Sequence, residues 1–237
     1  MNKPFKFKQF TVQQNQCAMK IGTDSVLLGA WTPMDTNPFS ILDIGAGTGI
    51  LSLMLAQRSN AQLIDAIEVD DLAYEQCVDN FEASPWSDRL FCYHASLEEF
   101  TDEIEDKYDL IISNPPFYSE DYKTESEQRD LARFTDALPF DHLLNSVSQL
   151  LSEDGVFSVI IPFKEEDAFI ALASKFKLFP NSLLHVKGSS ESEIKRSLIS
   201  FSFSESEIKK ETLIIETSRH QYTNDYINLT KEFYLKM

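Results

Sequence analysis

The stretch of sequence that decides the fold is Asp43-Ile44-Gly45-Ala46-Gly47-Thr48-Gly49-Ile50. An apolar run at 41–44 leads into it, and residues 50–57 after it have the apolar content of a helix packed against a sheet. The alternating glycines let the backbone turn tightly and approach a ligand, and the following helix offers free N–H groups. We therefore predict a strand, a ligand-binding turn and a helix, in that order.

The spacing of these glycines indicates the class of ligand. A dinucleotide-binding turn prefers the pattern G-x-G-x-x-G. This chain has G-x-G-x-G, with Ile50 where the last glycine would fall. The pattern favours an adenosyl ligand without a pyrophosphate, and it makes Gly45, Gly47 and Gly49 the first candidate cofactor-binding residues.

The rest of the chain alternates short β-rich runs with helical ones. This alternation predicts βαβ units and a mostly parallel sheet with helices on both faces, in which ligands bind at the carboxyl ends of the strands. The predicted strands are 41–44, 63–69, 90–94, 110–113 and 156–161, with further β-type runs at 182–186, 197–203 and 212–216. The predicted helices are 50–57, 73–81, 140–151, 165–176 and a last one that begins at Thr223 or Asn224. We expect Gly155 to end the helix at 140–151.

Acidic and polar residues follow the next two strands. Glu68, in Ile67-Glu68-Val69-Asp70, lies about 20 residues beyond the glycine turn, the distance expected of an acceptor for ribose hydroxyls. Asp70 is the less favoured candidate. After the third strand, the stretch Ala95-Ser96-Leu97 is placed to frame the edge of an adenine.

The turn Asn114-Pro115-Pro116-Phe117 directly follows the fourth strand. Two consecutive prolines hold this backbone in an extended conformation, so its carbonyl groups stay fixed. The side-chain oxygen of Asn114 and the carbonyl of Pro115 can accept the two hydrogens of a planar amino group and aim its lone pair at a methyl donor. Phe117 offers a face to a target base swung out of its stack, and Tyr118 is a possible second wall.

Each of these features also has a purely structural interpretation. The Pro-Pro turn can be a rigid loop with a hydrogen-bonding Asn, and acids at strand ends are commonly only solvated. The order of the glycine turn, Glu68 and Asn114 on successive strands favours methyl transfer over that interpretation.

Composition limits the function classes further. The net charge of −17 argues against a protein that coats nucleic acid non-specifically, although residues 1–23 carry four lysines and no acid. No apolar run reaches the roughly 18 to 20 residues of a membrane span, and the first ten residues lack the apolar region of a signal peptide. The three cysteines have no metal-type spacing, so we interpret them as reduced thiols. We expect a cytoplasmic protein without a membrane segment or a metal.

The ordered motifs DIGAGTG, IEVD and NPPF resemble those of class I Rossmann-like methyltransferases that act on amino nitrogens. The segment 19–31, MKIGTDSVLLGAW, is similar to the start of the bacterial tRNA (adenine-N(6)-)-methyltransferase family, which modifies adenine 37 of valine tRNA. The tail at 222–226 and 233–235 is similar to the end of that family. One departure is Ser96, where many relatives carry Asp.

This resemblance implies a single domain with a seven-stranded, mostly parallel Rossmann-like sheet. This domain would comprise an extension at 1–40 that closes over S-adenosylmethionine and a catalytic core at 41–237. The protein would be a monomer that binds tRNA and no metal. The expected cofactor-binding residues are Lys20, Gly22, Thr23, Asp43, Gly45, Gly47, Gly49, Glu68, Val69, Ser96 and Asn114. The expected catalytic residues are Asn114, Pro115, Pro116 and Phe117. The basic residues expected to contact RNA are Lys3, Lys6, Lys8, Lys123, Arg129, Arg133 and Arg196.

Three other functions fit part of the pattern. Protein glutamine N(5)-methyltransferases use the same turn but carry a separate helical N-terminal domain, for which we expect 40 residues to be too few. Guanine-specific rRNA N(2)-methyltransferases share the Asn-Pro-Pro-Phe turn, which alone does not choose between guanine and adenine. A catalytically silent cofactor-binding module is a third possibility, against which Asn114 and Phe117 argue.

Overall fold

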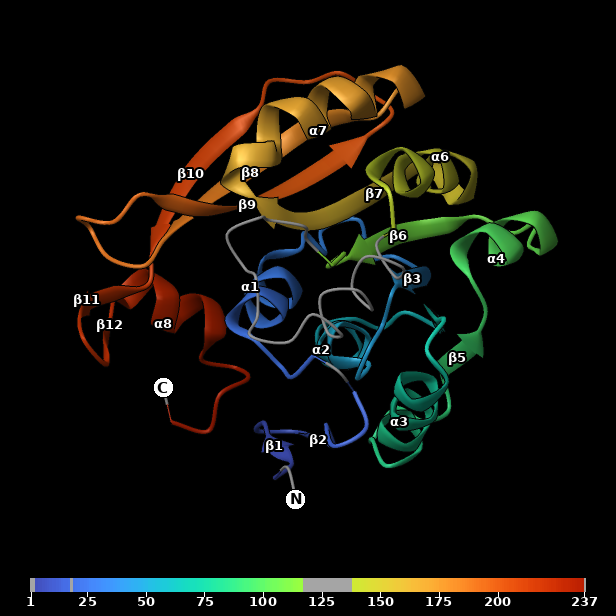
Figure 1. Cartoon of the computed structure of the whole chain (residues 1–237), viewed down its shortest axis with the longest axis horizontal. Helices are drawn as coiled ribbons and strands as arrows, with labels where there is room; N and C mark the ends of the chain where they lie inside the picture. The colour runs from blue at the N-terminus through green and yellow to red at the C-terminus, as the bar shows by residue number, and fades with distance from the viewer. Residues whose placement is uncertain (1–2, 18, 117–137, 237) are drawn as a thin grey trace, which may run out of the picture.

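The computed structural model of the chain describes residues 3–17, 19–116 and 138–236 (Figure 1). Its centre is an eight-stranded sheet with the order β10-β8-β9-β7-β6-β3-β4-β5, and only β9 is antiparallel to its neighbours. The strands are β3 Ser40–Ile44, β4 Leu63–Glu68, β5 Leu90–His94, β6 Tyr108–Ser113, β7 Leu151–Pro162, β8 Phe179–Lys187, β9 Ile194–Ser202 and β10 Lys209–Ile214.

Helices cover both faces of this sheet (Figure 1). Ile41 packs with the apolar side chains of one face and Leu42 with those of the other, because successive strand residues point to opposite faces. On the Ile41 face lie α1 Thr23–Trp31, α2 Ile50–Arg58, α3 Asp71–Glu82 and α8 Asn224–Thr230. On the Leu42 face lie α4 Leu97–Glu103, α6 Phe140–Leu150 and α7 Glu166–Ala173, with the short turns η2 Phe163–Glu165 and η3 Ser174–Phe176 before and after α7.

The two ends of the described chain pack on each other (Figure 1). The N-terminal ribbon of β1 Phe5–Lys6 and β2 Thr11–Val12 joins the tail through the bridge Phe7↔Tyr234. The Lys8 N–H also donates to the Phe233 carbonyl at 2.9 Å. A second ribbon, β11 Glu216–Ser218 with β12 Gln221–Tyr222, leads into α8. The N-terminal segment is therefore anchored before it reaches the edge of the sheet.

The Rossmann-like class predicted from the sequence is confirmed, but the sheet has eight strands rather than seven. The extra strand arises because 209–214 pairs in parallel with β8, so that all three β-type runs after β7 enter one sheet. The cap of the last helix is Thr223, whose hydroxyl accepts the Tyr226 N–H, and this helix ends at Thr230.

The prediction that Gly155 ends a helix is wrong. Helix α6 ends at Leu150, and Gly155 lies inside β7, where the pairing with β6 shifts register. A Cβ at Gly155 would lie 2.7 Å from a Leu151 side-chain carbon and 2.9 Å from the Ser152 carbonyl oxygen, so close packing within the bulge explains this glycine. No helix in the described ranges is both long and apolar enough to cross a membrane.

Candidate active site

The predicted motifs meet at one edge of the sheet. Strands β6, β3 and β4 are neighbours and run parallel, so their carboxyl ends lie side by side. Asn114 follows β6, the glycine turn follows β3, and Glu68 ends β4. The turn therefore lies between the predicted amine-binding residue and the predicted ribose-binding residue.

All three glycines of the turn have positive φ angles, +74° at Gly45, +55° at Gly47 and +76° at Gly49. L-residues with side chains rarely adopt this conformation. A Cβ at Gly45 or Gly47 would meet no atom within 4 Å, so the backbone there is open to a ligand. At Gly49 a Cβ would lie 2.5 Å from Phe81 and 2.9 Å from the Cys77 sulfur, so this glycine lets α3 pack against the start of α2.

The Glu68 carboxylate is fixed against the turn. Its Oε2 accepts the Gly47 N–H at 2.7 Å, and its Oε1 accepts the N–H groups of Val69 and Asp70 at 2.9 and 3.0 Å. Since a carboxylate oxygen accepts two hydrogen bonds, Oε2 retains a position for a hydroxyl donor. Asp70 instead caps α3 by accepting the Ala73 N–H. The structure thus supports Glu68 over Asp70 as the ribose acceptor.

Asp43 lies behind the turn and is completely buried. Its Oδ2 accepts both the N–H and the hydroxyl of Ser52 at 3.1 and 2.8 Å, which joins the end of β3 to α2. Burial raises the pKa of Asp43 to about 7, while the hydrogen bonds from Ser52 oppose that rise. Asp43 therefore supports the turn from within, and its contact with the cofactor stays a prediction.

Ser96 forms the N-cap of α4. Its hydroxyl accepts the Glu99 N–H at 3.2 Å and donates to Oε2 of Glu99 at 2.8 Å, a complete capping box. Hydrogen bonds from the Ser96 backbone and side chain lower the pKa of Glu99. The Ser96 hydroxyl is therefore used in the helix cap, which explains its presence without an adenine contact.

Two polar residues of α3 attach the N-terminal segment to the turn. Asn80 is buried, accepts the Gln13 N–H at 2.7 Å and donates to the Thr48 carbonyl at 2.9 Å. Gln76, one helical turn earlier and also buried, accepts the N–H groups of Asn15 and Gln16. Sequence reasoning missed both residues, although two amides spaced by four on an otherwise apolar helix face were an available signal.

The N-terminal segment continues past Glu68 to the start of α1. Burial, followed by the nearby charges of Glu68 and Asp70, raises the pKa of the Cys17 thiol to about 12. Lys20 is exposed, Gly22 is the N-cap of α1, and Thr23 is its exposed first residue. These positions are compatible with the predicted closure over the cofactor.

Asn114 is oriented by a residue that sequence reasoning missed. Its side-chain Nδ2 donates to the Ser25 hydroxyl at 3.0 Å, across from the first turn of α1. The Ser113 hydroxyl donates to the Ile44 carbonyl at 2.9 Å and fixes the end of β6 to β3. Because the amide nitrogen is bound to Ser25, the amide oxygen is presented as a hydrogen-bond acceptor. Pro115 is buried and Pro116 half-buried.

The start of α1 is held by an ion pair. Arg196 Nε lies 2.8 Å from Oδ2 of Asp24, which connects α1 to β9. Arg196 was expected to contact RNA, but its guanidinium is engaged within the protein. The predicted residues Phe117, Tyr118, Lys123, Arg129 and Arg133 lie outside the described residues. In the described part of the chain, no three His, Cys, Asp or Glu side chains are grouped as a metal site.

Comparison with known proteins identifies the family. The family model of the methyltransferase small domain matches residues 17–162, which include α1, the glycine turn and Asn114. The chain belongs to this methyltransferase family. Its cofactor is S-adenosylmethionine, as the resemblance implied.

Several relatives match over 98% or more of the chain. A tRNA1(Val) (adenine(37)-N6)-methyltransferase of Flavobacterium psychrophilum is 63% identical over 98% of this chain and 100% of its own length. The protein of the same name from Flavobacterium johnsoniae is 64% identical with the same coverage. That from Bacteroides fragilis is 46% identical over all of both chains.

Solved structures show the same fold at low identity. A predicted O-methyltransferase from Agrobacterium tumefaciens has a TM-score of 0.69 and 18% identity, covering 89% of this chain and 96% of its own. A methyltransferase from Pyrococcus furiosus has a TM-score of 0.57 and 19% identity, covering 80% and 90%.

The residues at the edge fit an adenosyl cofactor. Gly45 and Gly47 leave open space where side chains would stand, and Glu68 has an acceptor position directed by the turn. These two features suit a ribose that lies close to the backbone.

Proposed function

We propose that this protein transfers the methyl group of S-adenosylmethionine to the 6-amino nitrogen of adenine 37 in tRNA1(Val). The full-length relatives that carry this name, 41% to 64% identical, support the choice of substrate. The observation that carries the chemistry is the hydrogen bond from Asn114 Nδ2 to Ser25, because it leaves the amide oxygen to accept a hydrogen of an amino group.

The reacting nitrogen needs such an acceptor. The lone pair of an adenine amino group is delocalised into the ring, so the nitrogen is a poor nucleophile in its planar form. Asn114 Oδ1 and the Pro115 carbonyl would each accept one of its hydrogens, which favours a tetrahedral nitrogen with a directed lone pair. Most of the rate would then come from positioning and from fixed dipoles that replace water.

The cofactor supplies an electrophilic methyl group on a sulfonium, and this chain's residues hold that group in reach. We propose that Glu68 accepts the ribose hydroxyls and that Gly45 and Gly47 admit the cofactor to the backbone. We also propose that 1–40 is an extension that closes over it and that 41–237 forms the catalytic core. Asn80 supports this arrangement because it bonds both the N-terminal segment and the glycine turn.

Nucleoside analysis of tRNA tests the proposal. Purified protein is incubated with total tRNA from cells that lack the gene and with methyl-labelled S-adenosylmethionine. We expect the label in N(6)-methyladenosine, and labelling at least about 100-fold slower with the Asn114→Ala variant. Label in N(2)-methylguanosine or only in protein would contradict the proposal and favour the guanine- or glutamine-methylating alternative.

A further inference from the structure

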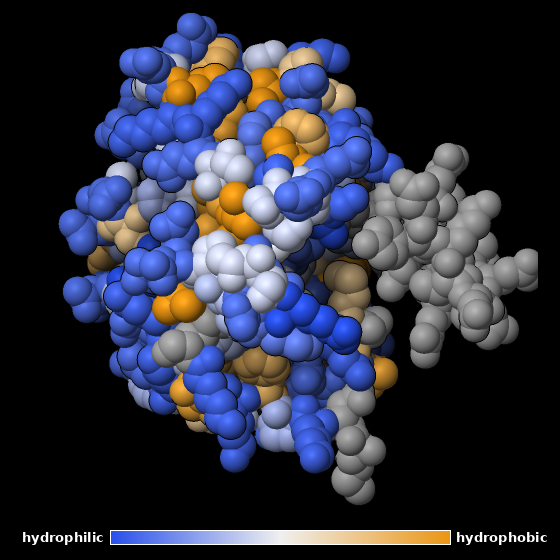
Figure 2. All heavy atoms as spheres, turned by 90° about the vertical axis from the view of Figure 1, so that its left-hand side faces the viewer, coloured by the Kyte–Doolittle hydropathy of each residue, from blue (hydrophilic) through white to orange (hydrophobic). Residues whose placement is uncertain are grey.

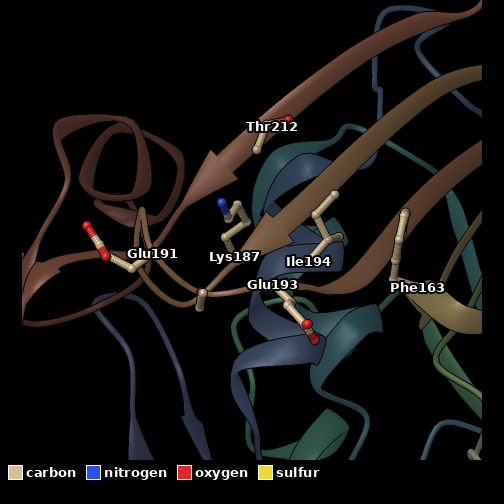
Figure 3. Close-up of a pocket in the computed structure, with 7 residues that line it drawn as sticks. Phe163, Lys187, Glu191, Glu193, Ile194 and Thr212 are labelled. Carbon is tan, nitrogen blue, oxygen red and sulfur yellow. The ribbon is translucent and has the colours of Figure 1, made fainter.

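A cavity lies on the same edge of the sheet as the turn at Asn114, on the antiparallel side of the sheet (Figure 3). It measures about 640 Å³ and combines an aromatic ring, an aliphatic side chain, an amine and a hydroxyl with two acids. We call it the flank pocket and define it by Phe163, Lys187, Ile194, Thr212, Glu191 and Glu193. Its size is within the range of small-ligand sites.

The flank pocket lies further along the direction of strands β6 and β7 than the turn at Asn114. Ser113 at the end of β6 pairs with Val159, and β7 continues to Pro162 before Phe163 leaves the sheet. At about 3.3 Å per residue, Phe163 lies about 10 Å further along the strand direction than Asn114, on the neighbouring strand. A base that enters the turn at Asn114 therefore sits deeper than a neighbouring nucleotide at Phe163. That is the geometry required when one base is swung out of its stack.

Phe163 is held with its ring partly exposed. It meets His185 edge-on, with ring centroids 5.1 Å apart, and is 38% exposed. His185 Nε2 lies 2.7 Å from Oε2 of Glu166, and the buried Ser197 hydroxyl donates to the same oxygen. The ring thus rests on a fixed polar network and does not sink into the core, as suits a platform on which a base stacks.

The polar groups of the flank pocket suit the rest of a nucleotide. In Figure 3, Phe163, Lys187 and Ile194 extend to the same side of the strand ends, whereas Glu193 extends to the opposite side and Glu191 away from Lys187. Lys187 Nζ donates to the Ser190 carbonyl at 2.8 Å and has two further hydrogens for a phosphate oxygen. A shift of register between Val186 and Lys187 brings Ile194 opposite Lys187.

The surface around the flank pocket favours a polar partner. Figure 2 shows the side of the molecule that carries the loop between β8 and β9 as mostly hydrophilic, with small separate apolar patches. A large continuous apolar patch would have indicated a protein partner instead.

We propose that the flank pocket binds an unpaired nucleotide of the RNA substrate, next to the target adenosine, with its base on Phe163 and its phosphate at Lys187. This inference rests on the proposed function, because the RNA strand must continue past the same edge once its target base reaches Asn114.

Two variants and two matched controls test it. Phe163→Ala should raise KM for tRNA by about tenfold through lost stacking, with kcat and the Kd for S-adenosylmethionine within about twofold. Lys187→Ala should reduce the slope of log affinity for tRNA against log salt by about 0.7, the value of one phosphate contact on a single strand. The controls are Phe39→Ala and Lys209→Ala, an exposed aromatic and an exposed lysine at the amino ends of β3 and β10, and they should change neither quantity.

An abasic substrate identifies the contact itself. Removing the base on one side of the target nucleotide from an anticodon stem-loop should raise KM for wild-type protein but not further for Phe163→Ala. Unchanged KM and unchanged salt slope in both variants would overturn the proposal, as would an equal loss of S-adenosylmethionine affinity. If wild-type protein methylates no tRNA nucleoside, the proposed function fails. The flank pocket is then still tested by tRNA binding: a salt slope that is the same for Lys187→Ala and wild-type protein would overturn the phosphate contact at Lys187.

Discussion

The two halves of the sheet's carboxyl edge differ in where in the sequence their functional residues come from. In the half formed by β3, β4 and β6, each strand leads directly into a motif, and those motifs act through backbone conformation and strand-end side chains. In the half formed by β7 to β10, the flank pocket takes side chains from η2, β8, β9, β10 and the loop between β8 and β9, around an antiparallel strand. A site formed by backbone groups next to one strand is visible as a local sequence pattern. A surface formed by side chains that are distant in the sequence has no such pattern.

The largest expected effect is a loss of kcat in a variant of the half formed by β3, β4 and β6. Asn114→Ala removes the acceptor for the amino group, and we expect kcat to fall by at least about 100-fold, as for the loss of one fixed dipole in an active site. The Kd for S-adenosylmethionine should stay within about threefold. Asn60→Ala, an exposed asparagine that follows α2, is the control for substitution. An equal loss of cofactor affinity would make Asn114 a cofactor-binding residue instead.

Cofactor affinity should respond to Glu68. Glu68→Gln replaces charge-assisted hydrogen bonds by neutral ones, and we expect the Kd for S-adenosylmethionine to rise by about tenfold, measured by calorimetry. KM for tRNA should not change. Glu75→Gln, an exposed acid on α3, is the matched control. A Glu68→Gln variant that weakened tRNA binding as well would show that the two halves are not separate.

Loss of the hydrogen bond that orients Asn114 should have a smaller effect on kcat. Ser25→Ala removes the acceptor for Nδ2, and we expect kcat to fall by about fivefold, the value of one hydrogen bond, with KM for both substrates unchanged. Ser25→Thr keeps the hydroxyl and should recover most of the rate. If both variants lost the same activity, packing at the start of α1 rather than amide orientation would be responsible.

The last prediction concerns stability and Asp43. Its pKa rises from 3.8 to about 7 on folding, so its contribution to stability is complete below about pH 4 and is lost as the pH rises through 7. The slope has a limit of about 1.4 kcal/mol per pH unit. Asp43→Asn should flatten the fall in the free energy of unfolding between pH 4 and 7, measured with urea. An unchanged slope would assign that fall to other groups.

The parts of the site predicted from sequence are those encoded locally. The glycine turn, Glu68 and Asn114 each stand within a few residues of the strand that positions them. Ser25 was missed because it lies 89 residues from Asn114, and its role depends on how α1 packs above β6.

The errors in the fold have the same origin. Gly155 looked like a helix end because its close approach to Leu151 is visible only once β7 is paired and bulged. The eighth strand depended on an edge pairing, between β10 and β8, that no local pattern specifies.

The most direct test of the central claim compares two tRNA1(Val) transcripts that differ only at nucleotide 37. Purified protein, labelled S-adenosylmethionine and each transcript are incubated to completion, and methyl groups per tRNA are counted. With adenosine at 37 we expect one methyl group per molecule, located on the 6-amino nitrogen. With guanosine at 37 we expect none. Equal labelling of both transcripts would contradict methyl transfer to adenine 37 at the Asn114 turn.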